Sequence, residues 1–217
     1  MNQRKTTPRQ WLALAALCLA AFGGGVLLRQ AGPVGTDVSG SIDLAEFRED
    51  RTAPSSGPAD APVTLHVFTD YQCSPCRLGH PAMLAAARQA GDVRIVYRDL
   101  PRLGPLSERA ARVALAADNQ GLYRPVHDAL MAERRRLDDP VLREIVERAG
   151  GDWARIDADL RSDPEIGAQL AVNTADALRL GLAGTPTYLI GPYRVVGVLD
   201  EREFARAFAQ AREADAR

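Results

Sequence analysis

The chain has 217 residues, of which 46% are hydrophobic and 25% are charged, and these values are ordinary for one globular domain with a sizeable core. Its formal net charge is −1, and four basic residues precede Gln30, so acidic residues outnumber basic ones in the remainder. These values exclude a basic surface for nucleic acid, and we interpret the arginine run at 134–136 as the solvated face of a helix.

Residues 1–29 have the pattern of a targeting segment. Three basic residues come first, an uncharged run follows over residues 11–28, and Arg29 ends the segment. This charge asymmetry keeps the basic end inside and places the rest of the chain across the membrane. We expect a cleaved signal peptide or, in preference, an uncleaved signal anchor. The body then lies in the periplasm or on the extracytoplasmic face of the cell membrane, where disulfides form.

The chain then alternates between loop-forming segments and segments that favour strands or helices. Residues 30–56 are rich in Gly, Pro, Ser and Asp and are predicted to be a flexible tether. A β-branched and aromatic run predicts a strand at 62–69, apolar residues at helical spacing predict a helix at 77–89, and residues 92–100 predict a second strand. A CxxC sequence therefore lies between the first strand and the helix.

The region from residue 107 to residue 182 is predicted to be almost entirely helical, with breaks at glycine and proline. The predicted helices are 108–119, 124–135, 140–149 and 168–180. The last segments are Gly184-Thr185-Pro186, a hairpin of strands at 187–190 and 193–198 around Gly191-Pro192, and a helix at 200–212.

The CxxC sequence has four interpretations. A structural zinc site needs four ligands, but beyond the apolar segment the chain offers only two cysteines and the histidines His66, His80 and His127. Attached haem is excluded because Arg77 stands where that motif needs histidine. A purely structural disulfide would close a very short loop and stabilise little. A redox pair is favoured, because the helix N-terminus stabilises Cys73 as the thiolate that attacks in exchange.

Several segments together resemble the DsbA-like thiol:disulfide oxidoreductases, a family with the thioredoxin fold. The resemblance covers residues 57–208 and is carried by GPADAPVT at 57–64, FTDYQCSPCR at 68–77, YRDLP at 97–101, the stretch 114–123, HDAL at 127–130 and GLAGTPT at 181–187. It implies an α/β thioredoxin-like fold over 57–217. A helical domain is inserted at about 105–182, and the N-terminal membrane segment and the tether precede the fold.

The resemblance also implies roles for six residues. Cysteines of the motif carry the catalysis, the two residues between them modulate it, and a Thr-Pro loop with a cis proline docks the substrate. In this chain these are Cys73 as nucleophile and Cys76 as resolving cysteine, Ser74 and Pro75 between them, and Thr185 and Pro186 in the docking loop.

The chain departs from the family pattern at Val67. Many relatives carry a buried acid six residues before the nucleophile, so proton transfer to Cys76 must here use another group or water. His66 is adjacent, but neighbours on a strand point to opposite faces, so His66 is predicted to face away from that position. We predict that His66 and His127 are structural, whereas the helical spacing of His80 allows it to lie near Cys76.

The combined pattern predicts an extracytoplasmic thiol:disulfide oxidoreductase that acts as an oxidase on cysteine-containing proteins and needs no metal or other cofactor. A membrane redox partner, quinone-linked or of the thiol-relay type, is expected to keep it oxidised. Two alternatives remain open. Ser74 and Pro75 supply no cation and resemble the motif of reducing thioredoxins, which favours a reductase. A copper-binding or copper-delivery protein would instead use Cys73, Cys76 and His80 as ligands.

Overall fold

The computed structural model describes residues 11, 17–18, 32–40, 47 and 52–215, and the chain divides into two units, Met1–Pro33 and Val34–Arg217. The predicted signal peptide or anchor at 1–29, with its apolar run at 11–28, lies almost entirely outside the described residues. Among the residues that are described, none belongs to a helix with the length and apolarity needed to cross a bilayer. The elements named below belong to the second unit.

A six-stranded sheet with the order β1-β6-β5-β3-β4-β2 is the central layer of this unit. Its strands are β1 (Thr36–Asp37), β2 (Ser55–Ser56), β3 (Val63–Thr69), β4 (Val93–Asp99), β5 (Thr187–Ile190) and β6 (Tyr193–Val196). β3 and β4 run parallel, and the other neighbouring pairs are antiparallel. β5 and β6 form the hairpin that the sequence predicts.

The central strand β3 is buried on both faces, as its run of β-branched, aliphatic and aromatic residues allows. Leu65 and Val67 pack into one hydrophobic cluster, and Phe68 packs into a second cluster. His66 points away from the first cluster, and its ring meets that of Phe47 edge-on with the centroids 5.9 Å apart. The prediction that His66 and Val67 face opposite ways is confirmed.

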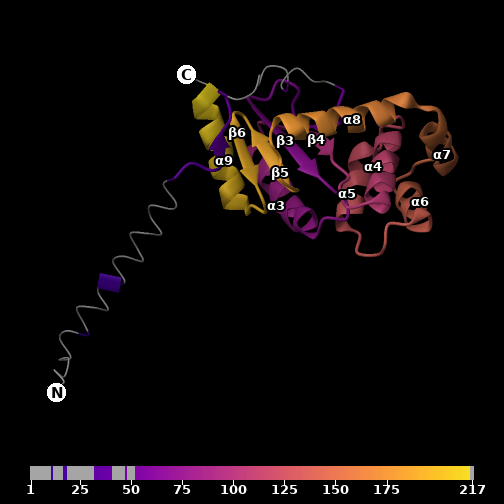
Figure 1. Ribbon diagram of the computed structural model, residues 1–217, viewed down its shortest axis with the longest axis horizontal. Coiled ribbons are helices and arrows are strands. Elements are labelled where there is room, and N and C mark those ends of the chain that lie inside the picture. The colour runs from indigo at the N-terminus through magenta and orange to yellow at the C-terminus, as the bar shows by residue number, and fades with distance from the viewer. Residues whose placement is uncertain (1–10, 12–16, 19–31, 41–46, 48–51, 216–217) are drawn as a thin grey trace. The chain divides into compact units, whose positions relative to one another are not determined.

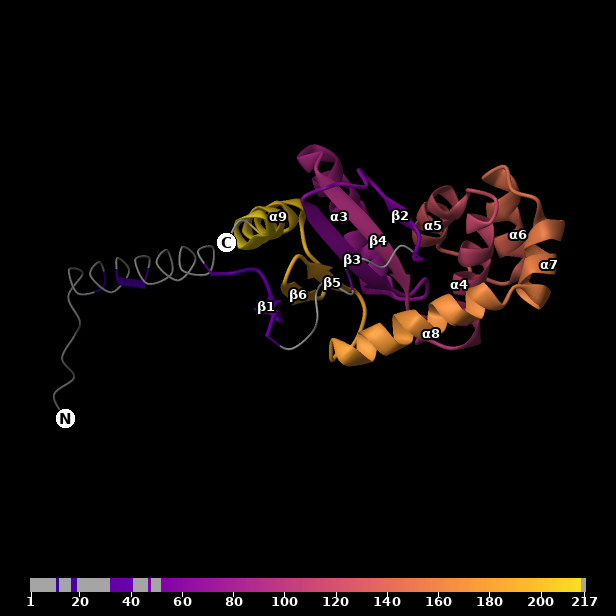
Figure 2. The same cartoon turned by 90° about the horizontal axis from the view of Figure 1, so that it is seen from above.

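Helices cover both faces of the sheet, as Figures 1 and 2 show. α3 (Ser74–Ala90) and α9 (Glu201–Asp215) pack against each other and against the face that carries Leu65. α8 (Pro164–Arg179) runs along the opposite face, where Ala177 joins the second cluster. Both surfaces of β3 are therefore shielded, which explains why Phe68 on one face is buried as fully as Leu65 on the other.

The predicted helical insertion at about 105–182 consists of α8 and of four helices between β4 and α8, which pack together beyond one end of the sheet (Figure 2). They are α4 (Pro105–Asp118), α5 (Tyr123–Ala132), α6 (Asp139–Arg148) and α7 (Trp153–Ser162). α7 is not among the helices that the sequence predicts. Its start is set by the Asp152 cap, and its apolar residues Trp153, Ile156 and Leu160 stand at helical spacing, a pattern that the sequence analysis did not use.

The helix after the CxxC sequence begins earlier than predicted. The sequence places its start at residue 77, whereas α3 begins at Ser74 and includes Pro75 in its first turn. Proline is favoured there because the first-turn N–H groups have no intrahelical partner. Pro81 lies inside the helix, which therefore lacks one backbone hydrogen-bond donor at this point. The motif is thus part of the helix and not a loop in front of it.

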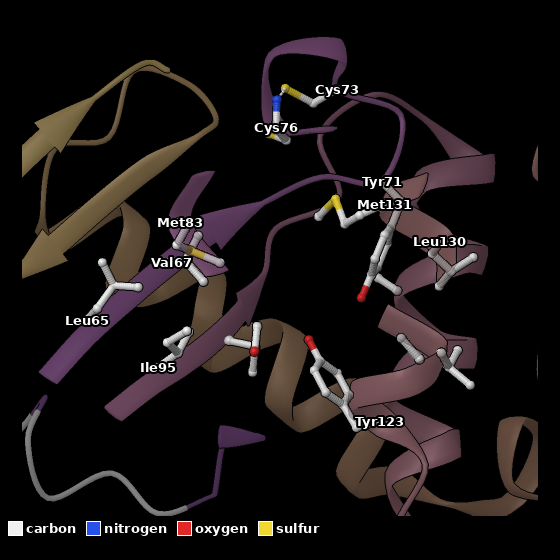
Figure 3. Close-up of a cluster of buried hydrophobic side chains, with 14 of the residues drawn as sticks. Leu65, Val67, Tyr71, Cys73, Cys76, Met83, Ile95, Tyr123, Leu130 and Met131 are labelled. Carbon is white, nitrogen blue, oxygen red and sulfur yellow. Dashed lines mark hydrogen bonds between the residues drawn. The ribbon is translucent and has the colours of Figure 1, made fainter. Parts of the chain in front are cut away.

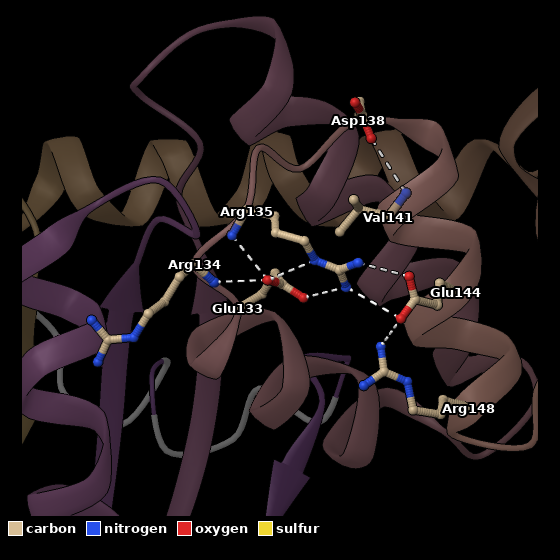
Figure 4. Close-up of polar contacts among 7 residues, drawn as sticks. All are labelled: Glu133, Arg134, Arg135, Asp138, Val141, Glu144 and Arg148. Atoms are coloured by element: carbon tan, nitrogen blue, oxygen red, sulfur yellow. Dashed lines mark hydrogen bonds and ion pairs between the residues drawn. The ribbon is translucent and has the colours of Figure 1, made fainter.

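The segment that connects α5 to α6 forms ion pairs within itself and with α6 (Figure 4). Arg135 donates to Glu133 at 2.7 Å and to Glu144 at 2.8 Å. The Glu133 carboxylate also accepts from the two following backbone N–H groups, and such local bonds compete with helical ones. The arginines at 134–136 therefore lie in a non-helical connection, and their assignment to a helix face is wrong. They remain largely exposed to solvent.

Part of the predicted tether at 30–56 is built into the sheet. β1 pairs with β6 and β2 pairs with β4, so each edge of the sheet ends in a short strand. Gly57 follows β2 with φ at +94°, and a Cβ there would lie 2.3 Å from the carbonyl oxygen of Val93. Only glycine therefore fits this approach, which leads the chain from β2 towards β3.

Candidate active site

Cys73 lies at the N-terminus of α3. It is the N-cap residue, with extended backbone angles, and its Sγ accepts a hydrogen bond from the backbone N–H of Cys76 at 3.3 Å. This N–H is one of those that the first helical turn leaves without an intrahelical partner. An N–H donor and the positive end of the helix dipole thus face the Cys73 sulfur.

The two cysteines differ in exposure. Cys73 is 6% exposed and Cys76 is 1% exposed, and both are free thiols. Figure 3 shows them at one edge of the buried cluster that continues past Val67 towards Leu65 and Ile95. The order of exposure agrees with Cys73 as the sulfur that a partner protein can reach.

The Thr-Pro loop lies directly against the cysteine pair. The bond between Thr185 and Pro186 is cis, and the carbonyl oxygen of Thr185 accepts a hydrogen bond from the Cys73 thiol at 3.3 Å. The register pairs Phe68 with Thr187, so the loop before β5 meets the end of β3, where the cysteines follow. The fold therefore brings together the cysteines and the Thr-Pro pair that the sequence predicts for one site.

The environment of Cys76 keeps it in the thiol form. Burial, followed by the hydrogen bond with the Cys73 side chain, raises the pKa of Cys76 from 9.0 to about 12. The backbone of Asp70 and the side chain of Thr185 act in the opposite direction and lower this pKa. Cys76 thus needs nearby polar groups whenever it must carry a negative charge.

Tyr188 lies beside Val67, the position at which many relatives carry a buried acid. The β3–β5 register places it directly opposite Val67, so both side chains share one face. Its hydroxyl reaches α3, since a Cβ on Gly79 would lie 3.0 Å from that oxygen. Burial, followed by the charges of Cys76 and Cys73, raises the pKa of Tyr188. The sequence analysis missed this hydroxyl, although the strand register could have indicated it.

Asp70 organises the loops around the motif. Its Oδ1 accepts from the backbone N–H of Gln72 at 2.8 Å and from the Ser107 hydroxyl at 2.7 Å. Its Oδ2 accepts from the backbone N–H groups of Arg102 and Leu103 at 2.7 and 2.9 Å. One buried carboxylate therefore joins the chain before the cysteines to the start of the helical insertion. The sequence analysis gave Asp70 no such role.

A buried polar network lies below the motif, between β4 and α5. Tyr71 bonds to Nδ1 of His127 at 2.7 Å, and Tyr123 donates to Asp99 at 3.0 Å. Burial raises the pKa of Asp99 to about 7, although the hydroxyls of Tyr71 and Tyr123 lower it. The sequence predicts a structural His127, and the ring indeed packs among these aromatic side chains.

The remaining predicted residues lie on α3. Ser74 and Pro75 are exposed on the first turn of α3 and place no charge beside Cys73. His80 turns its Nε2 towards Asp128 on α5, at 3.0 Å. Its ring centroid is 5.1 Å from that of His127. His80 is thus engaged with the helical insertion.

Comparisons with known proteins agree with this geometry. Residues 64–209 match the family of DSBA-like thioredoxin domains. A thioredoxin-like oxidoreductase from Silicibacter pomeroyi superimposes with a TM-score of 0.76 at 32% identity, covering 79% of this chain and 99% of that one. The thiol-disulfide exchange protein alpha-DsbA2 from Wolbachia pipientis superimposes with a TM-score of 0.70 at 25% identity, covering 77% and 92% respectively.

A curated relative extends the comparison to larger proteins. A Na(+)/H(+) antiporter from Salinispora tropica is 31% identical over 164 residues, which make up 72% of this chain and 25% of that protein. The chain spans about a quarter of the length of the curated relatives it matches. The predicted thioredoxin-like α/β fold with a helical insertion is confirmed. The chain therefore belongs to the family of DSBA-like thioredoxin domains.

Proposed function

We propose that this protein works outside the cytoplasm as a thiol oxidase that passes a Cys73–Cys76 disulfide to cysteine-containing proteins. The observation that carries this proposal is the 3.3 Å contact between the Cys73 thiol and the carbonyl oxygen of Thr185. The less buried sulfur lies against a loop whose backbone can pair with an extended substrate segment. Docking and exchange are thus combined in one place.

Exchange proceeds in two displacement steps. A substrate thiolate attacks Sγ of Cys73, the Cys73–Cys76 bond breaks, and its electron pair goes to Cys76. Cys76 then takes up a proton, as its raised pKa of about 12 favours. A second substrate thiolate attacks the substrate sulfur of the mixed disulfide, and Cys73 leaves as a thiolate facing the N–H of Cys76. The substrate gains a disulfide, and the enzyme is left with two thiols.

A second protein must reoxidise the enzyme after each cycle. The chain has three cysteines in all, and the third, Cys18, lies in the N-terminal apolar run. No second cysteine pair is therefore available in this sequence to pass electrons onward. We propose a membrane redox partner, quinone-linked or of the thiol-relay type, as the acceptor of the two electrons.

Two features of the sequence, one inside the CxxC motif and one on the strand before it, bear on the direction of electron flow. Ser74 and Pro75 supply no cation to stabilise the reduced thiolate, which makes the disulfide less oxidising than one with a histidine between its cysteines. Val67 removes a negative charge that would disfavour the thiolate, which acts the opposite way. The expected potential lies between those of DsbA and thioredoxin, roughly −120 to −270 mV. A reductase is the second candidate, favoured by Pro75.

The structure gives less support to copper delivery through the motif. Such a protein would use Cys73, Cys76 and His80 as ligands and would keep the site open. Instead, the Thr185 carbonyl lies against Cys73, and His80 bonds to Asp128. These contacts support exchange as the role of the cysteine pair.

The proposed location rests on the N-terminal sequence. Basic residues followed by the apolar run at 11–28 indicate export of the rest of the chain, with the run kept as an anchor or removed. Protease treatment of spheroplasts tests this location. Digestion of the domain at residues 57–217 is expected, whereas full protection would contradict it.

Trapping of mixed disulfides tests the roles of the cysteines. A Cys76→Ser variant should accumulate mixed disulfides, because its Cys73 thiolate can attack the disulfide of a substrate protein and no neighbouring thiol is left to release that protein. A Cys73→Ser variant should not accumulate them. The reverse pattern would show that Cys76 is the attacked sulfur. Equilibration with glutathione buffers, read by alkylation of free thiols, tests the direction. A potential clearly below the thioredoxin value, or a fully reduced protein in its own compartment, would make the protein a reductase.

A further inference from the structure

A cluster of three possible metal ligands lies between α3 and α5, away from the Thr-Pro loop. One nitrogen of His80, one nitrogen of His127 and one carboxylate oxygen of Asp128 all lie within 4.8 Å of one another. His80 is 7% exposed and His127 is 0% exposed. Two imidazoles and one carboxylate, from the two helices α3 and α5, thus converge on a largely buried point.

The hydrogen bonds of His127 leave one of its nitrogens without a partner. The Tyr71 and Tyr123 hydroxyls lie 2.7 and 3.3 Å from Nδ1 of His127, so the hydrogen bonds of this ring are made by Nδ1. An Nδ1–H donated to one of these hydroxyl oxygens leaves the lone pair of Nε2 for a metal, which is the tautomer that a metal-binding histidine needs. Nε2 is buried and has no hydrogen-bond partner, which is costly for a polar atom unless a ligand binds it.

We propose that His80, His127 and Asp128 bind a borderline divalent cation of the Zn²⁺ class. Imidazole nitrogen and carboxylate oxygen are the ligands that such ions accept at about 2.0–2.2 Å. His80 Nε2 and Asp128 Oδ1 are already 3.0 Å apart, a separation that two ligands of one ion can keep. This role goes beyond the sequence prediction, in which the histidines are structural or serve the cysteine pair.

The surroundings support the three ligands in the way that known metal sites do. Metal-binding histidines usually donate their second N–H to a nearby oxygen, and here the hydroxyls of Tyr71 and Tyr123 both lie within hydrogen-bond distance of Nδ1. Arg124 donates to Oδ2 of Asp128 at 2.7 Å, which fixes the carboxylate and leaves Oδ1 for the ion. The Arg124 charge weakens cation binding, so moderate affinity is expected.

The ion would join the helix that carries the cysteines to the helical insertion. His80 belongs to α3, one turn beyond Cys76, whereas His127 and Asp128 belong to α5. Binding would replace the single hydrogen bond between His80 and Asp128 with two bonds to one cation. The site is independent of the proposed oxidase role, because it uses neither cysteine.

Zinc titration of a protein without thiols tests the proposal. We would use the untagged full-length chain with Cys18→Ser, Cys73→Ser and Cys76→Ser, so that no thiol can bind the metal, and follow Zn²⁺ by calorimetry. One ion per chain is expected. Asp128→Asn, at a partly exposed position, should weaken binding at least thirtyfold, and His80→Gln should do the same. His66→Gln, a buried histidine on β3, is the matched control and should leave affinity unchanged.

Two further readouts separate a metal site from a structural hydrogen bond. Co²⁺ in the same protein should give the visible spectrum of a nitrogen and oxygen site, and Zn²⁺ should raise the unfolding temperature of the parent but not of Asp128→Asn. Circular dichroism checks that each variant is folded. If His80→Gln does not fold, the result for Asp128→Asn tests the proposal by itself. Absence of saturable Zn²⁺ binding, or binding that Asp128→Asn leaves unchanged, would overturn the proposal.

Discussion

The Cys73 thiol donates a hydrogen bond to the carbonyl oxygen of Thr185 at 3.3 Å, although 112 positions separate the two residues. The first turn of α3 places Cys73, and the start of β5 places Thr185. α3 follows β3 directly, and β5 is the neighbour of β3 in the sheet, so both residues arrive at the same end. The chemistry of the cysteines therefore depends on groups from β5 as well as on the motif itself.

Cys76 should stay a thiol far above neutral pH. Burial is the main cause that raises its pKa from 9.0 to about 12. In a Cys73→Ser variant, we expect iodoacetamide to alkylate Cys76 up to roughly a thousandfold more slowly near pH 8 than in the same protein unfolded in urea. Mass spectrometry of quenched samples over a range of pH measures the rate. A plateau near pH 9 in the folded protein would contradict the prediction.

The same shift predicts a loss of stability at alkaline pH. The folded protein holds the Cys76 proton more tightly than the unfolded chain, because the pKa rises from 9.0 to about 12 on folding. This contribution to the free energy of unfolding is fully present below pH 9 and is lost as the pH rises towards 12. The free energies of unfolding of the reduced protein and of Cys76→Ala, measured by urea denaturation, should therefore change with pH at different slopes over that range. Parallel pH profiles would exclude the effect.

Thr185→Val should slow resolution and leave docking intact. The Thr185 hydroxyl lowers the pKa of Cys76, and valine lacks this hydroxyl. The substitution keeps the backbone carbonyl that contacts Cys73. We expect kcat for disulfide exchange to fall roughly three- to tenfold with KM unchanged, because the Cys76 thiolate becomes harder to form. Thr185→Ser restores a hydroxyl and should recover the rate. A raised KM with unchanged kcat would instead assign the side chain to docking.

Tyr188→Phe tests the hydroxyl opposite Val67. The ring packs edge-on against Phe204 with the centroids 5.0 Å apart, and phenylalanine keeps this contact, so stability should change by less than about 1 kcal/mol. The rate at which Cys76 resolves a mixed disulfide should fall roughly threefold or more, because a polar group near both sulfurs is lost. Tyr193→Phe, on the partly exposed strand β6, is the matched control. Equal single-turnover rates for both variants would rule out this role.

Asp70→Asn should destabilise the fold around the motif. The carboxylate accepts four hydrogen bonds, and an amide turned towards Ser107 loses the bond from the backbone N–H of Gln72. We expect the free energy of unfolding to drop by about 1–3 kcal/mol, measured by urea denaturation. Asp60→Asn, at an exposed position, should change it far less. Similar losses in both variants would show that Asp70 does not organise these loops.

The sequence by itself determined the features that depend on near neighbours. Runs of β-branched and aromatic residues identified the strands at 62–69 and 92–100, because side-chain shape acts within a few residues. The CxxC spacing between a strand and a helix singled out Cys73 and Cys76 for redox chemistry. Most inserted helices were recognisable from breaks at glycine and proline, whereas α7 was missed although Trp153, Ile156 and Leu160 stand at helical spacing.

Only the tertiary structure decided which distant side chains meet. Tyr188 faces Val67 because of the β3–β5 register, and a shift of one residue would turn it to the other face. His80 reaches Asp128 because α3 packs against α5, and no local pattern encodes that packing. Local spacing fixes the face of an element on which a side chain lies, but its partners follow from how whole elements pack. The three ligands of the proposed cation site therefore became visible only in the folded chain.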